Sequence, residues 1–297
     1  MFKPIALALL ISLCSTAGAV SLGSKHAMVI DEETGAVLLE KNSTDIVPIA
    51  SLTKLMTAMV VLDANLDMAE NITITDADVD VLKHSSSRVP VGAVLTRGIL
   101  LELALMSSDN RAAFALARTY PGGMTEFRNA VRNKAHSLNL RRTNIEEPTG
   151  LSRFNTSTAA DMAKLAIAAS KYPDIEKITT AAGESIDVDG TATRYNNTNR
   201  LVSDKKWTIL LSKTGFTNEA GRCIIMRVRA AGRNAIMVLL NARESVIRTA
   251  DATRLHRLLT GEPEMQVAEA SIVKQRGSKR IKGKKGKAYA SVALLSR

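Results

Sequence analysis

The chain of 297 residues is long enough for one large domain or two ordinary ones, and its hydrophobic content of 45% excludes disorder as the main state. Its net charge is +11, but one positive charge belongs to Lys3 and nine to residues 272–297, so residues 20–271 carry only +1. Aromatic residues make up just 3% of the chain. A nearly neutral body with so few aromatic platforms excludes a nucleic-acid-binding face outside the C-terminal tail, and we expect no nucleic-acid partner.

The N-terminus has the features of a secretory signal peptide. A basic start at Lys3 is followed by an apolar run over residues 4–14 and by small residues up to Ala19. The apolar run is shorter than the roughly 20 residues that a membrane span needs. We therefore expect cleavage after Ala19 and a periplasmic or secreted mature protein. A lipoprotein anchored through Cys14 is the alternative, which Leu13 disfavours because a small residue is expected before the lipidated cysteine.

The hydrophobic pattern of the mature chain predicts strands at both ends and helices between them. Apolar runs at residues 25–31 and 36–41 flank a polar turn and predict a hairpin. Apolar residues at helical spacing predict a helix over 51–66 that begins at Ser51. The pattern then predicts helices at 98–107, 110–119, 124–137 and 157–171 and short strands at 71–75 and 185–195. The last predicted elements are strands at 207–213, 221–230 and 234–241 and a helix at 245–259.

These elements predict an α+β fold with one domain over residues 20–262. A two-stranded hairpin is not stable alone, so we expect it to join the three later strands in a five-stranded antiparallel sheet, covered by the helices of 51–66 and 245–259. The helices of residues 70–205 then form a mostly helical inserted lobe. Residues 263–297 predict a flexible basic tail, with electrostatic attraction to anionic membrane or wall polymer as its expected role. A solubilising end without a partner is the alternative.

Cysteine and histidine usage limits the chemistry. After cleavage of the signal peptide only Cys223 remains, so no intramolecular disulfide can form, and its apolar neighbours indicate a buried small hydrophobe. The four histidines are scattered without metal-ligand spacing. The sequence therefore predicts neither a metal nor a cofactor.

The first motif with candidate chemistry is Ser51 and Lys54 at the start of a predicted helix. Residues three apart on a helix face the same side and lie within reach of one another. A lysine whose pKa is lowered by burial or by a neighbouring cation can accept the proton of a serine and so make it nucleophilic. The alternative is a capping serine followed by a solvent-facing lysine.

The second motif is Ser-Asp-Asn at residues 108–110, at a break between two predicted helices. Such a break exposes short polar side chains, so Ser108 can relay a proton and Asn110 can hydrogen-bond a substrate amide. Helix capping is the alternative, since these residue types are favoured caps.

The third motif is Lys-Thr-Gly at residues 213–215, at the end of a predicted strand. Gly215 lets a substrate backbone approach the strand, and Lys213 supplies positive charge for a carboxylate and lowers the pKa of a neighbouring lysine. The alternative is an ordinary strand end.

Together and in this order, S-x-x-K, S-D-N and K-T-G resemble the active-site motifs of the penicillin-recognising serine enzymes. Four further segments resemble the low-molecular-weight D-alanyl-D-alanine peptidases among the penicillin-binding proteins: IASLTKLMT at 49–57, EPTGLS at 147–152, NTNRL at 197–201 and KTGFTN at 213–218. ALMSSDNRAA at 104–113 and Phe216 are most similar to the D-alanyl-D-alanine endopeptidase branch. The resemblance covers residues 24–260.

The resemblance implies an acyl-enzyme mechanism on peptidoglycan stem peptides, without cofactor, and inhibition by β-lactams. Ser51 would attack the D-alanyl carbonyl, Lys54 would accept its proton, and Ser108 with Asn110 would pass it to the leaving amine. Backbone N–H groups of Ser51 and Phe216 would form the oxyanion hole. The substrate-binding residues implied are Asn110, Lys213, Thr214, Gly215 and Phe216.

Cleavage of D-alanyl–diaminopimelate cross-links is the expected activity, and removal of the terminal D-alanine, as by a carboxypeptidase, is the first alternative. A class A-like β-lactamase would need an E-x-x-L-N loop between the second and third motifs, and residues 111–210 contain no such stretch. An inactive wall-binding module is the last alternative. The intact Ser51, Lys54, Ser108 and Lys213 argue against it.

Overall fold

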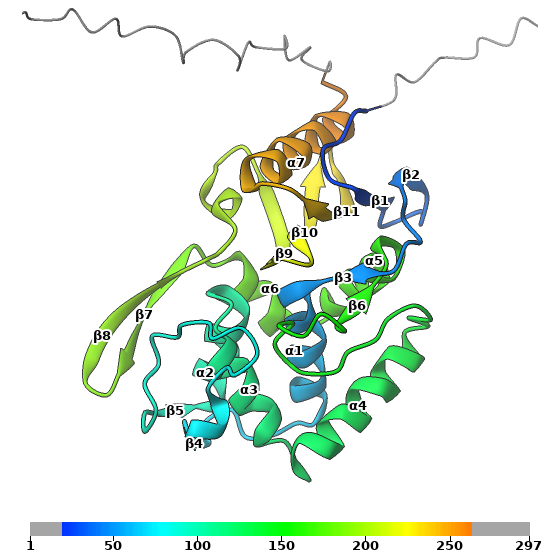
Figure 1. Cartoon of the computed structure of the whole chain (residues 1–297). Helices are drawn as coiled ribbons and strands as arrows, with labels where there is room; N and C mark the ends of the chain where they lie inside the picture. The colour runs from blue at the N-terminus through cyan, green and yellow to red at the C-terminus, as the bar shows by residue number, and fades with distance from the viewer. Residues whose placement is uncertain (1–19, 263–297) are drawn as a thin grey trace, which may run out of the picture. The chain divides into compact units, whose positions relative to one another are not determined.

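A five-stranded antiparallel sheet combines the first two strands of the chain with the last three (Figure 1). The structure is a computed structural model that describes residues 20–262; the predicted signal peptide (1–19) and basic tail (263–297) lie outside the described residues. The strands are β1 (His26–Asp31), β2 (Val37–Lys41), β9 (Thr208–Thr217), β10 (Gly221–Ala230) and β11 (Arg233–Ala242). Their order is β2-β1-β11-β10-β9. The first hairpin thus joins the later strands, and the predicted α+β fold with a five-stranded antiparallel sheet is confirmed.

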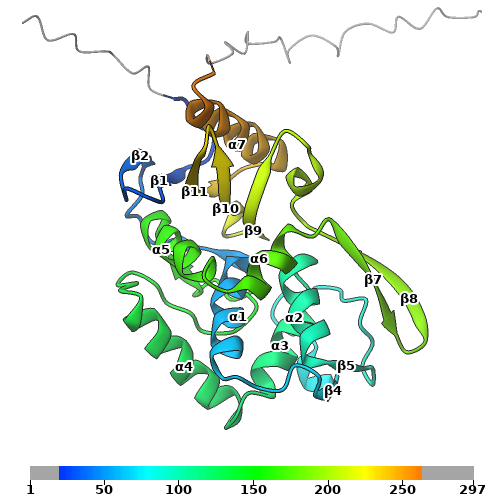
Figure 2. The ribbon, with the colours of Figure 1, turned by 180° about the vertical axis from the view of Figure 1, so that it is seen from behind.

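Helices cover both faces of the sheet (Figures 1 and 2). α7 (Ser245–Thr260) packs on β10 and β11, while α5 (Ala159–Ala169) contacts β1, β10 and β11. Side chains of β11 point alternately to the two faces of the sheet. Met237 and Leu239 lie on the side of α7, and Val238 and Leu240 lie on the other side. Two separate apolar layers therefore enclose the sheet.

The expectation that the helix of residues 51–66 covers the sheet is wrong. α1 (Thr53–Asp63) lies among other helices and meets the sheet mainly through the 3-10 turn η1 (Ala50–Leu52), which packs on β9 and β10. Every residue of α1 from Thr53 to Val61 is buried, as a helix packed on all sides requires. The periodicity of the sequence identifies the helix but not the element that lies against it.

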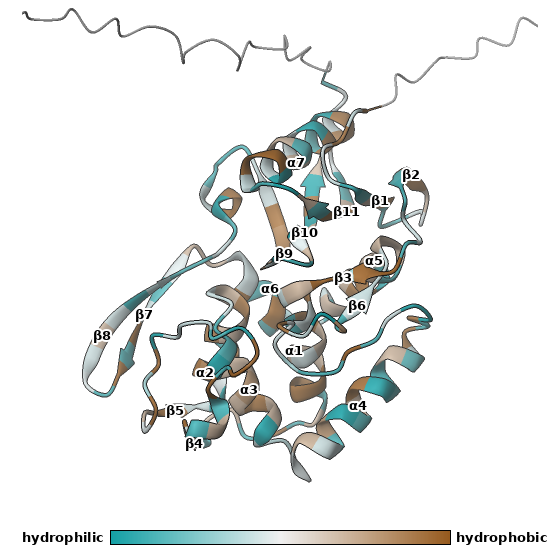
Figure 3. Cartoon of the chain, viewed as in Figure 1, coloured by the Kyte–Doolittle hydropathy of each residue, from teal (hydrophilic) through white to brown (hydrophobic). Residues whose placement is uncertain are grey.

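The other helices form a mostly helical lobe. α2 (Arg97–Met106), α3 (Asn110–Arg118) and α4 (Gly123–Ser137) pack against α1, as does α5, while α6 (Pro173–Thr180) packs against α2 and β9. Hydrophilic residues recur along α4 (Figure 3), whose buried residues are Phe127 and Val131. The sequence pattern missed α6, because a helix of eight residues that buries Ile175 and Thr179 has too weak a period to recognise. No helix within the described part of the chain is long and apolar enough to span a membrane.

Three two-stranded sheets and two short 3-10 turns complete the lobe. The pairs are β3 (Val47–Pro48) with β6 (Thr156–Ser157), β4 (Asn71–Thr73) with β5 (Val94–Thr96), and β7 (Gly183–Val188) with β8 (Thr191–Asn196); the turns are η2 (Asp76–Asp78) and η3 (Arg200–Ser203). The single strand predicted over 185–195 is a hairpin. Asp189 and Gly190 turn the chain there with φ of 51° and 79°.

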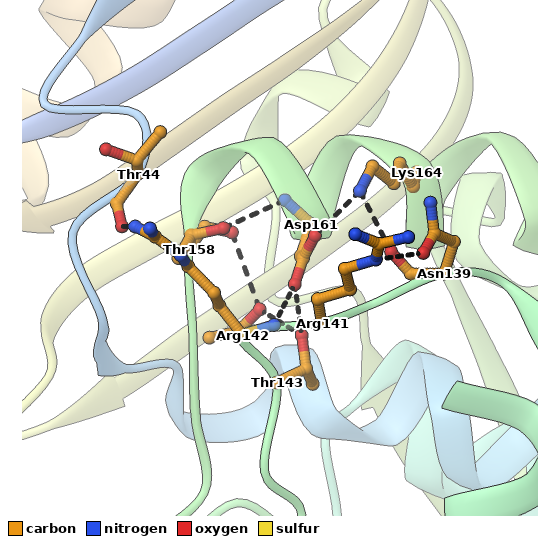
Figure 4. Close-up of polar contacts among 9 residues, drawn as sticks. Thr44, Asn139, Arg141, Arg142, Thr143, Thr158, Asp161 and Lys164 are labelled. Atoms are coloured by element: carbon orange, nitrogen blue, oxygen red, sulfur yellow. Dashed lines mark hydrogen bonds and ion pairs between the residues drawn. The ribbon is translucent and has the colours of Figure 1, made fainter. Parts of the chain in front are cut away.

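Asp161 fastens the segment after α4 to the first turn of α5 (Figure 4). Thr158 caps α5 by accepting a hydrogen bond from the Asp161 N–H at 3.0 Å. The Asp161 carboxylate accepts bonds from the Arg142 backbone N–H at 2.8 Å and the Thr143 hydroxyl at 3.1 Å, and Lys164 lies 2.9 Å from its other oxygen. Since the chain continues from Thr143 to residues 147–150, this buried carboxylate helps to position a loop that reaches the candidate active site.

Candidate active site

Ser51 lies in the η1 turn directly before α1. The predicted helix start at Ser51 is therefore a 3-10 turn, and the α-helix begins two residues later, at Thr53. Ala50 has a φ of 47°, a left-handed conformation that is uncommon for a residue with a side chain. This backbone is held in place because Ile49 donates its N–H to the Asn155 carbonyl and η1 packs against β9. The turn presents Ser51 to a cavity.

Lys54, in the first turn of α1, is 1% exposed and makes three contacts through Nζ. Nζ lies 3.1 Å from Ser51 Oγ, 2.6 Å from Asn110 Oδ1 and 2.8 Å from the Thr149 carbonyl oxygen. These three oxygens fix the amine beside the serine hydroxyl. The distance to Oγ permits direct proton transfer.

Burial lowers the pKa of Lys54 from 10.5 to about 8, and the carboxylates of Glu147, Asp109 and Asp80 oppose this shift. A lysine with such a pKa is partly neutral near pH 7 to 8 and can then act as a base. The alternative of a solvent-facing lysine is contradicted by this burial.

Ser108 and Asn110 point into the same site from the break between α2 and α3. Ser108 has a φ of 61°, and its Oγ accepts a hydrogen bond of 2.8 Å from Lys213 Nζ. Asn110 donates through Nδ2 to Ser85 Oγ at 2.8 Å, which leaves Oδ1 toward Lys54. Asp109 has the capping role, since it accepts the N–H of Ala112 at the start of α3. The capping alternative thus holds for Asp109, while Ser108 and Asn110 contact Lys213 and Lys54.

Lys213, Thr214 and Gly215 lie inside β9, which extends to Thr217 instead of ending near residue 213 as predicted. β9 is the edge strand of the five-stranded sheet and has no strand partner on its outer side within the described residues. Edge strands of this kind can pair with an extended peptide. Lys213 is 1% exposed; burial, and then the charges of Lys54 and Arg248, hold its pKa well below the usual range. A Cβ at Gly215 would lie 3.0 Å from the Ile49 carbonyl oxygen, so glycine lets β9 approach the η1 turn.

A cavity of about 270 Å³ connects these elements. Its lining residues are Ser51, Ser108, Thr198, Thr214, Gly215, Phe216, Arg222, Ser245 and Arg248. Of the residues selected from sequence, Lys54, Asn110 and Lys213 lie behind this lining and reach it through Ser51 and Ser108. Phe216 is 46% exposed at the cavity.

Sequence reasoning missed Arg222, Ser245 and Arg248. Arg222 comes from β10 and Arg248 from α7, so only the folded sheet and its covering helix bring them to β9. No short motif marks them. Within residues 20–262, no group of three or more His, Cys, Asp or Glu side chains is placed to hold a metal ion.

The sequence also did not predict the role of Glu147. Its buried carboxylate holds the loop that contacts Lys54. Its oxygens accept hydrogen bonds of 2.7 Å from the N–H groups of Thr149 and Gly150 and of 3.1 Å from Asn155 Nδ2. These bonds turn the Thr149 carbonyl toward Lys54. The sequence of residues 147–152 resembles the family, but the contact of the Thr149 carbonyl with Lys54 depends on the fold.

Gly150 is expected to be intolerant of a side chain. It has a φ of 88°, and an added Cβ would lie 2.0 Å from the Ala50 carbonyl oxygen, directly beside Ser51. Gly150→Ala should therefore lower the free energy of unfolding by at least about 2 kcal/mol and displace the serine. Thermal unfolding and penicillin acylation rates measure both effects. Gly190→Ala is the matched control, because its φ is 79° but nothing lies within 4 Å of the added Cβ. Equal losses in the two variants would contradict the steric argument.

The sequence of the chain is similar to those of known proteins of one family. The profile of peptidase family S11, D-alanyl-D-alanine carboxypeptidase, matches residues 14–244. The chain is 44% identical over 244 residues to the D-alanyl-D-alanine endopeptidase of Pseudomonas aeruginosa, covering 81% of this chain and 79% of that protein. It is 39% identical over 260 residues to the D-alanyl-D-alanine endopeptidase of Escherichia coli, covering 87% and 84%.

Solved structures agree with this assignment. The fold is similar to that of penicillin-binding protein D2 from Listeria monocytogenes in the ampicillin-bound form, with a TM-score of 0.70 and 28% identity over 80% of this chain and 98% of that one. The family profile covers most of the sequence, and the S-x-x-K, S-D-N and K-T-G motifs meet at one cavity. The chain therefore belongs to the D-alanyl-D-alanine carboxypeptidase family of serine peptidases, peptidase family S11.

Proposed function

We propose that this serine hydrolase cleaves D-alanyl–diaminopimelate cross-links in peptidoglycan through an acyl-enzyme on Ser51. The observation that carries the proposal is the 3.1 Å contact between Lys54 Nζ and Ser51 Oγ, because it pairs a buried lysine of lowered pKa with a hydroxyl at the cavity. The endopeptidase names of the Pseudomonas aeruginosa and Escherichia coli relatives support the choice of bond.

In acylation, neutral Lys54 takes the proton of Ser51 Oγ while that oxygen attacks the D-alanyl carbonyl carbon. The negative charge that develops on the carbonyl oxygen is stabilised by the backbone N–H groups of Ser51 and Phe216. The proton taken up by Lys54 is then passed by Ser108, with Asn110, to the leaving amine as the amide C–N bond breaks, so Lys54 is neutral again. Ser108 is held for this relay by the hydrogen bond that its Oγ accepts from Lys213. Water hydrolyses the resulting ester and regenerates Ser51.

The carboxylate next to the scissile bond is bound by the cations of the cavity. Thr214 lies in the cavity wall, and Lys213 Nζ lies directly behind Ser108. Arg248 keeps a permanent charge there, with one terminal nitrogen donating to the Cys223 carbonyl at 3.3 Å. Asn110 would hold an amide of the donor peptide, although its Oδ1 contacts Lys54 in the free protein.

The same acylation chemistry would make the protein a penicillin-binding protein, as the ampicillin-bound Listeria monocytogenes relative supports. We also propose a periplasmic location and a role in cell wall remodelling and cell shape, because peptidoglycan lies outside the inner membrane. Terminal D-alanine removal is the second candidate activity, since the matching family profile is named for carboxypeptidases.

A direct competition between substrates separates these two activities. Purified enzyme is incubated with cross-linked dimer muropeptides and free pentapeptide, and the products are weighed by mass spectrometry. We expect kcat/KM for the dimer to exceed that for the pentapeptide by about tenfold or more, because contacts on the leaving side add transition-state binding. Release of D-alanine alone would make the protein a carboxypeptidase.

A further inference from the structure

The active-site cavity contains more positive charge than one carboxylate requires. Arg222 and Arg248 both line it, and Lys213 lies behind Ser108. Neither arginine forms an ion pair with a carboxylate anywhere in residues 20–262. A terminal D-alanine offers one carboxylate, which the proposed function assigns to Arg248 and Lys213. That assignment gives no role to Arg222.

Arg222 is held at the cavity by the ring of Phe216. The two residues are directly opposite in the β9–β10 register and therefore project from the same face of the sheet. The guanidinium carbon lies 3.6 Å from the ring centroid, which is a close cation–π contact. Phe216 thus orients the arginine without neutralising its charge.

The acidic residue nearest to Arg222 in the sequence does not neutralise it. Glu219, in the β9–β10 turn, is ion-paired with Lys83 from the helical lobe. Arg222 also lies close to Arg248: burial, and after it the charge of Arg222, lowers the pKa of Arg248. Two neighbouring guanidinium groups of like charge would be stabilised by a second anion.

In the proposed function, Arg248 binds the carboxylate of the departing residue. Arg222 lines the same cavity close to Arg248 and so would lie on the leaving side of the scissile bond. In a cross-link the departing residue is diaminopimelate, and the peptide attached to it carries at least one further carboxylate. We propose that Arg222, oriented by Phe216, binds this second carboxylate and selects a cross-linked leaving peptide over a single D-alanine. The inference rests on the proposed endopeptidase function and adds its specificity determinant.

Removing the charge of Arg222 tests the subsite. For Arg222→Gln we expect KM for a cross-linked dimer to rise about tenfold, while kcat changes less than about twofold. The preference for the dimer, measured as kcat/KM for the dimer divided by kcat/KM for the pentapeptide, should therefore fall about tenfold. Arg222→Lys keeps the charge and should restore part of the ratio. Arg229→Gln is the matched control, because Arg229 lies on the same strand, is exposed and bonds only Asn234.

The substrate can be changed in the same experiment. A dimer in which the second carboxylate is replaced by a carboxamide should lose about tenfold with the wild-type enzyme and almost nothing further with Arg222→Gln. An unchanged dimer-to-pentapeptide ratio, or an equal effect of amidation on both enzymes, would overturn the subsite alone. A wild-type enzyme that leaves the dimer intact would overturn the proposed function, and the subsite with it.

Discussion

Ser51→Ala should form no covalent adduct with a labelled penicillin and should lose at least about 10³-fold in kcat on peptide substrates. The reason is that no other described side chain combines the two requirements of the reaction. Ser51 Oγ faces the cavity and lies 3.1 Å from Lys54 Nζ. Ser108, the other motif serine at the cavity, is hydrogen-bonded to Lys213 instead. The variant should still fold, since Ser51 Oγ has no structural bond besides that from Lys54.

Intact-protein mass spectrometry after incubation with the labelled penicillin measures the adduct. Ser137→Ala is the control, because Ser137 is exposed at the end of α4 and bonds only the Lys134 carbonyl. An adduct that forms in Ser51→Ala, or that peptide mapping places on another residue of the wild-type protein, would contradict the mechanism.

The second large effect concerns the protonation of Lys54. Its folded pKa of about 8 lies below the ordinary value of 10.5, so the neutral base is lost as pH falls through about 8. The rate of penicillin acylation should therefore decrease by about tenfold per pH unit below that value and level off above it. Stopped-flow acylation from pH 6 to 10 measures the midpoint.

Two substitutions separate proton acceptance by Lys54 from its charge. Lys54→Ala removes the base, and Lys54→Arg keeps a cation that does not deprotonate in proteins, so both should lose about 10³-fold or more in acylation. Lys171→Arg, on the surface after α5, is the control. An arginine variant that acylates at the normal rate would show that Lys54 is not the base. A midpoint near pH 10 would show that its pKa is not lowered.

The sequence was informative where structure depends on neighbouring residues. Apolar runs of β-branched and aliphatic residues identify β10 and β11, and the helical period identifies α1 and its reactive pair. Features that depend on distant segments were not predictable. The packing of α5 on the sheet, the meeting of Arg222 with Arg248, and the role of Glu147 beneath Lys54 all require the chain to be folded.

The backbone conformation of Ala50 is another feature that the local sequence does not predict. Nothing in the local sequence predicts a φ of 47° for an alanine before Ser51. It is stable because Gly150 and Gly215, each far away in the chain, leave space beside it. The S-x-x-K motif identifies the residues that react, and Gly150 and Gly215, which are distant from it in the sequence, allow the backbone that positions them.

Cys223 provides an internal probe of motion at the active site. The thiol is fully buried, its residue pairs with Gly215 across β9 and β10, and burial raises its pKa to about 11. An alkylating reagent can reach it only after the core around β10 has opened. When opening is fast and reversible, the alkylation rate measures the equilibrium constant of that opening. Comparing the alkylation rate with the rate of global unfolding then tells whether the core beside the catalytic strand opens locally.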